Sequence, residues 1–302
     1  MFPAFLATLL FSGSVIVAAR STRALGSDRA NLWRVIVATL ALGAWAHALG
    51  AGTGGGAFGM FFVSGCVGFG VGDIALYHCL PRLGPRLAAL MVNCLAAPFA
   101  AVIEWFWLGT TLTLAEAAFS AAILFGVALA LAPQRESNLP AGGRWLGIGL
   151  GIIAGLGQGL GAVLSRKGFE ISAAAGLQLD GGTAAYQRIL GGLAVVLLRL
   201  GWLLAMARLA KRPGALTDTA APPSRQVWPL VLANGLAGPT LGVACFQWAL
   251  KTTPAAIVLP ITATTPLVVI PFTWYFDHDR PGWRALIGGL LAVGGVIGLT
   301  LR

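Results

Sequence analysis

The chain places one carboxylate, Asp73, in the middle of an apolar segment, within Gly70-Val71-Gly72-Asp73-Ile74-Ala75-Leu76-Tyr77. A charged side chain in such surroundings is costly, so it marks either a functional site or a paired structural group. As a functional group, Asp73 could bind a substrate amine or take up a coupling proton. As a structural group, it would pair with an arginine or bond to a neighbouring helix. Tyr77 follows one turn later on the same helical face.

Other ionisable residues also lie within apolar segments. Glu104 follows Pro98 by six residues and either lines a cavity or lies near a membrane surface, and we keep it as a second coupling candidate. Arg34 and Arg188 occupy corresponding places in the two halves of the chain. Together they could hold an anionic group, although arginines that reach from a helix end toward lipid headgroups are commoner.

Neutral polar side chains in these segments could each bond a substrate or hold two helices together. Asn93 and Gln158 are best placed by their depth, and Trp248, beside Gln247, could form a cavity wall. The Thr265 hydroxyl could face a ligand, although bonding to its own helix is commoner. The predicted substrate site therefore consists of Asp73, Tyr77, Asn93, Gln158, Arg188, Gln247, Trp248 and Thr265.

The segments that carry these residues are long enough to cross a membrane. Of 302 residues, 57% are hydrophobic and 10% are charged, and apolar runs of about 20 residues, the length that spans the hydrocarbon layer, recur along the chain. No basic residue precedes the first run, so we expect it to stay as a helix and not to act as a secretory signal. The composition predicts an all-α integral membrane protein with ten transmembrane helices, near residues 2–19, 31–49, 57–80, 86–108, 113–132, 145–165, 183–206, 227–250, 255–275 and 283–301.

The net charge of +10 does not indicate nucleic-acid binding, because the basic residues are scattered over short connections instead of forming one stripe. Their distribution predicts orientation instead. Most Lys and Arg residues fall in the odd-numbered connections between spans, while the even-numbered connections and the termini hold only Arg166, Lys167, Lys251 and Arg302. By the positive-inside rule the odd-numbered connections face the cytoplasm and both termini face outward.

The second half of the sequence echoes the first. Leu10 to Arg20 and Leu156 to Arg166 have similar patterns in the opening span of each half, and a Gly-Val pair closes each half at Gly126 and Gly295. We therefore divide the chain into a first five-helix repeat at 1–133, a linker at 134–144 and a second five-helix repeat at 145–302. Because five is odd, the two copies are inverted in the membrane. Inverted repeats are typical of secondary transporters, whose sites lie where the repeats meet.

Glycines predict where the spans pack, since membrane helices associate through close contacts of small residues. The expected contact faces are Gly147, Gly151, Gly155 and Gly159, with Gly157 and Gly161 beside them, in the sixth span; Ser64, Gly68 and Gly72 in the third; and Ala285, Gly289, Gly294 and Gly298 in the tenth.

Prolines predict helix breaks, because each removes a backbone donor. Pro98 and Pro266 are the expected break points, and the hydroxyls near Pro266 could satisfy freed carbonyls.

Several stretches share the order of a known transporter module. They are Trp248 to Ile257 with Thr265-Pro266-Leu267, Gly161 to Arg166, and, in the first half, Gly72-Asp73, Leu83 to Leu90 and Pro98-Phe99. Together they resemble the drug/metabolite transporter superfamily, EamA type, over nearly the whole chain. The resemblance implies a ten-helix transporter of a small metabolite, often an amino acid, or of a drug-like compound. The family's Gly-Glu pair after the fourth helix is replaced by Gly109-Thr110 and His278-Asp279, so no role of that glutamate is carried over.

We expect a secondary transporter that works by alternating access, most simply an amino-acid exporter coupled to protons in a bacterial inner membrane. Its partners would be lipid and a small-molecule substrate, with no cofactor and no metal, and a homodimer is one option. A channel or a structural membrane subunit is the main alternative. An intramembrane enzyme is less expected, because the three histidines are scattered and no H-E-x-x-H or G-x-S-x-G pattern occurs in a suitable context. The few buried charges argue against a highly charged substrate, unless Arg34 and Arg188 both face the cavity and favour an organic anion.

Overall fold

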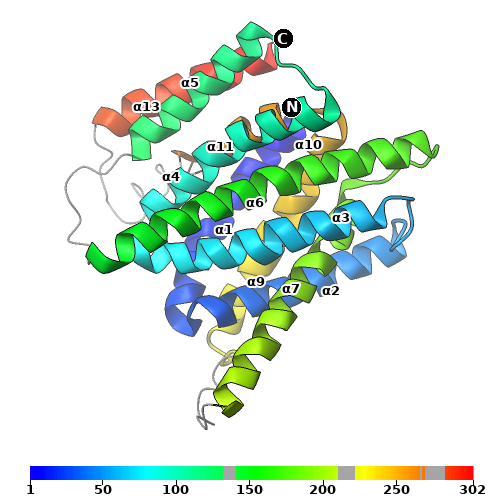
Figure 1. Cartoon of the computed structure of the whole chain (residues 1–302), viewed down its shortest axis with the longest axis vertical. Helices are drawn as coiled ribbons and strands as arrows, with labels where there is room; N and C mark the ends of the chain where they lie inside the picture. Colours follow the sequence, from blue (N-terminus) through cyan, green and yellow to red (C-terminus); the bar gives the residue numbers. More distant parts are fainter. Residues whose placement is uncertain (132–140, 210–221, 266, 269–282, 302) are drawn as a thin grey trace.

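The computed structural model describes residues 1–131, 141–209, 222–265, 267–268 and 283–301, and within these ranges the chain is helical with no strand (Figure 1). The long helices are α1 (Phe2–Leu25), α2 (Ser27–Ala48), α4 (Asp73–Leu108), α5 (Leu114–Leu131), α6 (Ala141–Ala174), α7 (Gly181–Leu209) and α13 (Trp283–Thr300). The shorter α-helices are α3 (Phe58–Gly65), α9 (Trp228–Gly235), α10 (Val243–Thr252) and α11 (Ala255–Ala263). Most predicted spans coincide with helices, although α6 is longer than expected and α11 ends well before residue 275.

The outer surface of the protein suits a lipid environment. Six helical stretches are long and apolar enough to cross a membrane, at Phe2–Leu25, Phe58–Cys79, Met91–Leu108, Gly143–Ala174, Gly181–Leu209 and Trp228–Thr252. Two shorter apolar helices cover Leu114–Ala130 and Leu286–Leu299. Large apolar side chains such as Phe106, Leu198 and Leu290 are 74–75% exposed. So much exposed apolar surface is unusual on a protein in water.

Two seven-residue π-helices interrupt the helical runs. The first, η1 (Cys66–Gly72), joins α3 to α4, and the second, η2 (Leu236–Gly242), joins α9 to α10. Each follows directly after a glycine and ends on another. A π-turn is rare and frequently lies at a functional site. Asp73 is the first residue after η1.

The helical run from Phe58 to Leu108 folds back on itself against α6. Along the first leg, glycines of α6 at 157, 161 and 168 face residues 72, 68 and 61 in turn, so this leg runs antiparallel to α6. Along the second leg, glycines at 147, 151 and 159 face residues 83, 91 and 96, so this leg runs parallel to it. The predicted third and fourth spans are these two legs (Figure 1). Leu83, which faces Gly147, lies within α4, so α4 contains the reversal.

The predicted glycine face of α6 is confirmed. A methyl group added to Gly155 would lie 2.9 Å from Leu95 Cβ, and one added to Gly159 would lie 2.6 Å from the Ala96 carbonyl oxygen. Distances this short leave no room for a side chain. The two helices therefore approach almost backbone to backbone, which is how membrane helices gain packing energy.

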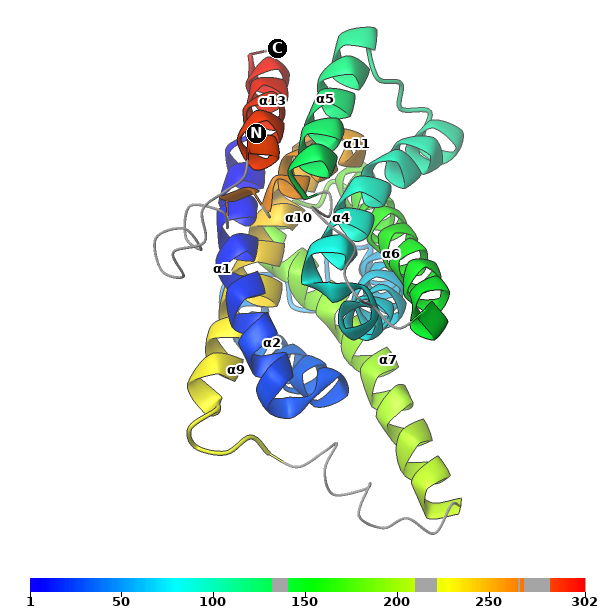
Figure 2. The ribbon, with the colours of Figure 1, turned by 90° about the vertical axis from the view of Figure 1, so that its left-hand side faces the viewer.

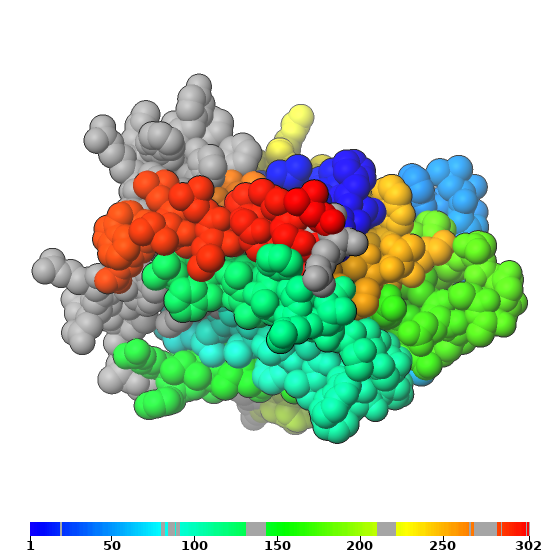
Figure 3. Space-filling model, turned by 90° about the horizontal axis from the view of Figure 1, so that it is seen from above, coloured from blue at the N-terminus to red at the C-terminus, as the bar shows by residue number. Residues whose placement is uncertain are grey.

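The predicted contact face of the last helix is partly wrong. Gly298 of α13 meets Phe119 of α5 as predicted, but Gly289 and Gly294 face open space. Two glycines that were not predicted make further close contacts to α5: Gly288 meets Gly126, and Gly295 meets Ile123. The helices α5 and α13 lie side by side at one end of the molecule (Figure 3). Because α13 carries glycines on several faces, the sequence does not show which of them meets a neighbour.

The opening helix of each half packs against the π-helix of the other half. Helix α1 lies along η2, where Gly242 faces Phe11, and Figure 2 shows α1 beside α9 and α10. Helix α6 lies along η1, where Gly72 faces Gly157. Helix α7 also contacts both π-helices, and α2 contacts η2. Residues of the two halves are therefore interleaved in the interior.

Of the two predicted helix breaks, only the one at Pro98 lies within the described residues. Helix α4 continues through Pro98, which is exposed, so no break occurs there; transmembrane helices tolerate proline when local adjustments satisfy the freed carbonyl. Pro266 lies outside the described residues, but α11 ends at Ala263, just before it. The hydroxyls of Thr262, Thr264 and Thr265 donate to the carbonyl oxygens of Leu259, Ile261 and Thr262 at 3.0, 2.6 and 2.6 Å. The threonines thus bond to their own backbone.

Candidate functional site

Asp73 lies buried between an arginine and a glutamine that come from two other helices. Its Oδ2 atom forms an ion pair with Arg34 of α2. Gln158 of α6 donates a hydrogen bond from Nε2 to the other oxygen, Oδ1, at 3.1 Å. Arg34 Nε in turn donates to Asn31 Oδ1 at 2.9 Å. The side chains of Asp73 and Arg34 are only 6% and 11% exposed, so water and salt screen their attraction weakly.

The Arg34 guanidinium contacts the Tyr77 ring as well as the Asp73 carboxylate. The Arg34 guanidinium carbon lies 4.9 Å from the centre of the buried Tyr77 ring, a distance typical of a cation–π interaction. The spacing of one helical turn between Asp73 and Tyr77 therefore brings both side chains to the same cation. The sequence singled out both residues, whereas Asn31 was missed because a single asparagine near a helix start is ordinarily a capping residue.

Arg188 of α7 is buried beside this group. It is 2% exposed, and its guanidinium carbon lies 5.1 Å from the ring centre of Phe69 in η1 and 5.9 Å from that of Phe246 in α10. Arg188 Nε makes no hydrogen bond with any described residue, and the acidic group close enough to attract it is Asp73. The interpretation of Arg34 and Arg188 as helix-end anchors is wrong, because helices from both halves enclose both guanidinium groups.

Glycines of η1 and α6 make room for the Arg188 side chain. A methyl group added to Gly68 would lie 2.5 Å from Arg188 Nη2, and one added to Gly161 would lie 2.9 Å from the same atom. These glycines were predicted as packing residues, and they do bring η1 and α6 together. They also leave the space that the guanidinium occupies, so the same glycines form both the helix contact and the pocket for Arg188.

A second polar cluster joins α3, α6 and α10. Gln247 Nε2 donates to Ser165 Oγ at 3.1 Å, Ser165 Oγ lies 2.8 Å from Ser64 Oγ, and Ser64 donates to the Gly161 carbonyl oxygen at 2.6 Å. Gln247 Oε1 is buried and makes no hydrogen bond with the described part of the chain. Gln247 was predicted as a site residue, whereas the two serines resemble packing residues in an apolar helix and were missed.

Glu104 lies at a separate place, where it caps a helix of the second half. Its two carboxylate oxygens accept the backbone N–H groups of Ala255 and Ala256, the first residues of α11, at 2.8 and 3.0 Å. Arg166 Nε lies 3.5 Å from Glu104 Oε1. A carboxylate at a helix N-terminus satisfies N–H groups that lack partners within the helix. Gln158 and Arg166 are eight residues apart on α6, so the two acids sit about 12 Å apart along that helix.

The remaining predicted residues have other surroundings. Trp248 is 49% exposed, Asn93 is partly exposed on the second leg of α4, and the Thr265 hydroxyl bonds to its own helix. The structure therefore brings together Asp73, Tyr77, Gln158 and Arg188, adds Arg34 and Asn31, and places Gln247 in the serine cluster.

A charged cluster that the sequence did not reveal lies next to Asn31. Arg199 Nε donates to Asp28 Oδ1 at 2.9 Å, and His78 Nε2 lies 3.4 Å from the same oxygen. Arg199 therefore pairs within the protein. A cavity of about 20 Å³, room for about one water molecule, is lined by Asp28, Asn31, Leu32, Ile74, Val196, Arg199, Leu200 and Leu203.

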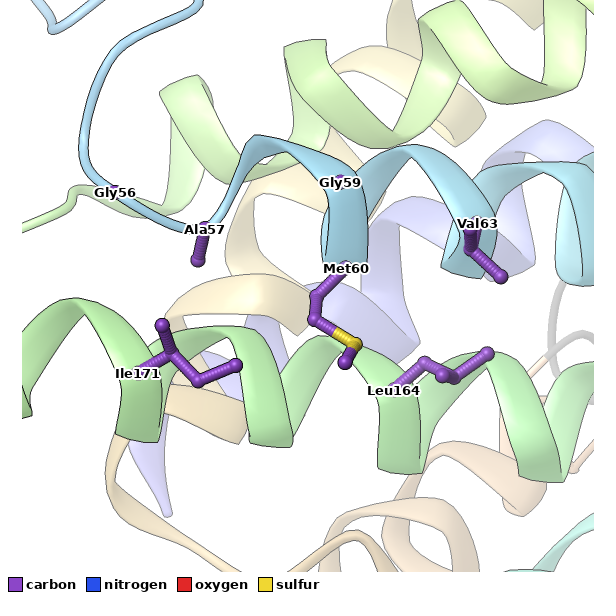
Figure 4. Close-up of a pocket in the computed structure, with 7 residues that line it drawn as sticks. All are labelled: Gly56, Ala57, Gly59, Met60, Val63, Leu164 and Ile171. Carbon is purple, nitrogen blue, oxygen red and sulfur yellow. The ribbon is translucent and has the colours of Figure 1, made fainter.

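A larger cavity, of about 500 Å³, lies between α3 and α6 (Figure 4). It is lined by Gly56, Ala57, Gly59, Met60, Val63, Leu164 and Ile171, and Figure 4 shows the Met60 side chain pointing from α3 toward α6. A binding site for a polar solute needs a few polar groups that orient it, and these side chains supply none. The candidate site is therefore the buried polar group around Asp73.

The fold and its apolar surface define a helical integral membrane protein that crosses the bilayer several times. The EamA-like transporter family matches residues 1–132 and 145–301, and the chain belongs to this family, part of the drug/metabolite transporter superfamily. The resemblance seen in the sequence is confirmed, and membership makes the protein a membrane transporter of small molecules.

A solved structure also resembles the protein. One chain, described only as the crystal structure of a protein, has a TM-score of 0.73 at 18% sequence identity, covering 99% of this chain and 96% of that chain. Identity this low shows a shared fold alone. No curated protein matches the chain in sequence.

Proposed function

We propose that the protein is a secondary transporter that moves a small metabolite by alternating access, with its substrate at the group around Asp73. The observation that carries this proposal is the meeting of charged and polar side chains from α2, α4, α6 and α7 in the interior. Charges inside a membrane protein are costly and mark substrate or ion pathways. In secondary transporters such sites lie near the bilayer midplane, between repeats.

The ten-helix organisation as two inverted five-helix repeats, with a linker at 134–144, is part of the proposal. Three pairs of features support it. Each half contains one seven-residue π-helix, the opening helix of each half packs on the π-helix of the other, and the closing helices α5 and α13 pack together. Such an arrangement allows one half to rock against the other around a fixed site.

Asp73 is assigned the coupling role in preference to Glu104. Both oxygens of Glu104 accept backbone N–H groups, so a proton there would disturb the cap of α11. Asp73 is held by the side chains of Arg34 and Gln158. Side chains can reorient when a proton or a substrate ammonium binds, whereas a backbone cap cannot move without its helix. Asp73 is therefore the better group for a charge that changes during transport.

An amino acid is the proposed substrate class, because its ammonium group complements Asp73 and its carboxylate complements an arginine. The proposed direction is export in exchange for protons across a bacterial inner membrane. The distribution of Lys and Arg supports cytoplasmic odd-numbered connections and outward termini. With this orientation the Asp28–Arg199 pair lies toward the cytoplasm and Glu104 toward the outside.

Transport by the purified protein in lipid vesicles tests the proposal. Labelled amino acids should cross the vesicle membrane saturably, and an imposed pH gradient should change the rate. A channel would give flux without saturation, and a structural subunit or an enzyme would give none above empty vesicles. The absence of saturable, gradient-dependent flux for amino acids, nucleotides, sugars, organic anions and organic cations would overturn the proposal.

A further inference from the structure

Among the described residues, Arg188 is a buried cation without a counter-ion of its own. Two guanidinium groups, those of Arg34 and Arg188, lie near one carboxylate, and Asp73 already forms its ion pair with Arg34. In the part of the chain that the structure describes, Arg188 makes neither a hydrogen bond nor an ion pair, and it is 2% exposed. The buried group therefore carries an excess of one positive charge.

This excess cannot be relieved by loss of a proton, since an arginine side chain stays protonated in proteins. A buried charge is unfavourable unless it is paired and hydrogen-bonded. The rings of Phe69 and Phe246 attract the guanidinium through their faces, but a ring face accepts no conventional hydrogen bond, and Nε has no acceptor among the described residues. An anion that brought acceptor oxygens would supply both the missing charge and the missing hydrogen bonds.

We infer that Arg188 is the anion-binding residue of the substrate site and that the substrate carries a carboxylate; this inference rests on the proposed transport function. The planar guanidinium presents N–H donors in a fork that matches a carboxylate. A bound monoanion makes the group neutral and a dianion reverses its charge, whereas a zwitterionic amino acid leaves the net charge unchanged but supplies Arg188 with a carboxylate partner. Phe69 and Phe246 would contact an apolar part of the same molecule.

The chemistry distinguishes two sources of the carboxylate. An amino acid also offers an ammonium group, which Asp73 would accept, while a simple organic acid offers only the anion. Both need Arg188, but only the amino acid needs the Asp73 carboxylate. A ligand panel of matched acids and amides therefore reports on Arg188, and an Asp73→Asn variant separates the two kinds of acid.

Melting temperatures of the full-length protein with four probes test the inference. The probes are leucine against leucinamide and benzoate against benzamide. We expect at least one acid, but not its amide, to raise the melting temperature of the wild-type protein. In Arg188→Gln the affinity for that acid should fall about 10- to 100-fold, which corresponds to the loss of a charge-assisted hydrogen bond. Arg199→Gln, on the same helix but paired with Asp28, should keep the preference for the acid.

A measurement without ligand keeps the test informative if the variant folds poorly. Removal of a charge without a counter-ion should leave the ligand-free melting temperature unchanged or higher, whereas Arg34→Gln, which breaks an ion pair, should lower it. A clear fall for Arg188→Gln would reveal an internal partner and overturn the inference. Amides that stabilise as well as acids, no stabilisation by either acid, or an unchanged acid preference in Arg188→Gln, would also overturn it.

The flux assay separates this inference from the proposed function. If the wild-type protein binds acids through Arg188 but moves none of the panel, the assignment of Arg188 stands and the transport proposal fails. If it moves a neutral compound saturably and Arg188→Gln leaves the affinity unchanged, transport stands and the assignment of Arg188 fails.

Discussion

Asp73 and Arg34 form an ion pair that links α4 to α2 across the interior of the protein. When one partner of a buried pair is lost, the other is left as an uncompensated charge, and this costs more than the pair itself contributes. The Asp73 carboxylate can therefore release Arg34 at low cost only when another charge takes its place. An anion beside Arg34 would do so, and a proton or a substrate ammonium would then compensate Asp73, which ties the opening of this contact to binding events.

Replacing Asp73 by Asn should abolish coupling to a pH gradient. The amide keeps the shape of the side chain but cannot exchange a proton, so flux into vesicles should no longer respond to the gradient. The loss of the charge leaves Arg34 unpaired and should lower stability by about 3–5 kcal/mol. The double variant with Arg34→Gln should recover part of that loss. Flux that responds normally to pH in a folded Asp73→Asn protein would contradict the coupling role.

Gly155→Leu should destabilise the packing of α6 on α4. A new Cβ would lie 2.9 Å from Leu95 Cβ, and overpacking of this kind costs about 1–3 kcal/mol. Gly149 of the same helix faces open space, so Gly149→Leu is a matched control that should change stability by less than about 0.5 kcal/mol. Melting temperatures in one detergent compare the two, and equal values would count against close packing at Gly155.

Glu104→Gln should lower the stability of the folded protein without changing the coupling of transport to protons. The amide cannot accept both backbone N–H groups of α11, and Arg166 loses its carboxylate partner. A loss on the order of 3 kcal/mol is expected, as for other broken buried pairs. Thermal melting measures the first effect, and flux against an imposed pH gradient measures the second. A variant that melts like the wild type but loses its response to pH would move the coupling role to Glu104.

Asp180, at the start of α7, should make the stability of the protein depend on pH. It accepts hydrogen bonds from the Thr183 N–H at 2.9 Å and from Trp45 Nε1 at 3.1 Å. Burial acts to raise the pKa of this carboxyl, but the hydrogen bonds from Thr183, Trp45 and Gly182 prevail and hold the pKa below its usual 3.8. The folded protein therefore binds this proton less readily than the unfolded chain does.

The sign of the effect follows from this lowered pKa. The contribution of Asp180 to stability is fully present above the unfolded-state pKa of about 4 and is lost as pH falls through the lower folded-state pKa. The difference in melting temperature between wild type and Asp180→Asn should be constant from about pH 5 to 7 and should shrink below about pH 4. Glu170→Gln, at an exposed position, is the control, and a difference that persists in acid would argue against this account.

Single cysteines at the two ends of α6 should report the orientation. Arg144 and Leu177 are both exposed and lie near opposite ends of this helix. After replacement of the four native cysteines, Arg144→Cys should react with a membrane-impermeant thiol reagent only from the cytoplasmic side, and Leu177→Cys only from outside. The reverse pattern would show that the orientation is opposite to the proposed one. Reaction of both cysteines from one side would show that α6 does not span the membrane.

Local pattern predicted much of the fold. Apolar length located the helices, and the four-residue glycine spacing located the packed face of α6, because both depend on residues close in sequence. The two π-helices were not predicted, since a π-turn depends on how glycine backbones meet neighbouring helices and leaves no repeating pattern. The contact face of α13 was partly wrong because its glycines surround the helix.

The candidate site was predicted only where its geometry is local. Asp73 and Tyr77 are one turn apart, so their shared face could be read from the sequence. Their common partner, Arg34, stands on another helix, and no spacing rule connects the two. Arg188 was interpreted as a helix-end anchor because most arginines near helix ends reach toward the headgroups. Its burial depends instead on η1 and α10, which supply Phe69 and Phe246 beside it.

The π-helices have a consequence for direction. Each residue of an α-helix advances the chain by about 100°, because 3.6 residues complete a turn, and a π-turn adds one residue to that count. Everything after η1 is thus rotated relative to α3 by roughly that angle, and Asp73 faces Arg34 with this rotation included. A change of η1 to regular α-helix would keep every residue and exchange its i→i+5 hydrogen bonds for i→i+4 bonds, yet it would turn the acid toward a different neighbour. Each half thus has a π-helix that rotates the helix following it, and this rotation determines the direction in which the polar side chains of that helix point.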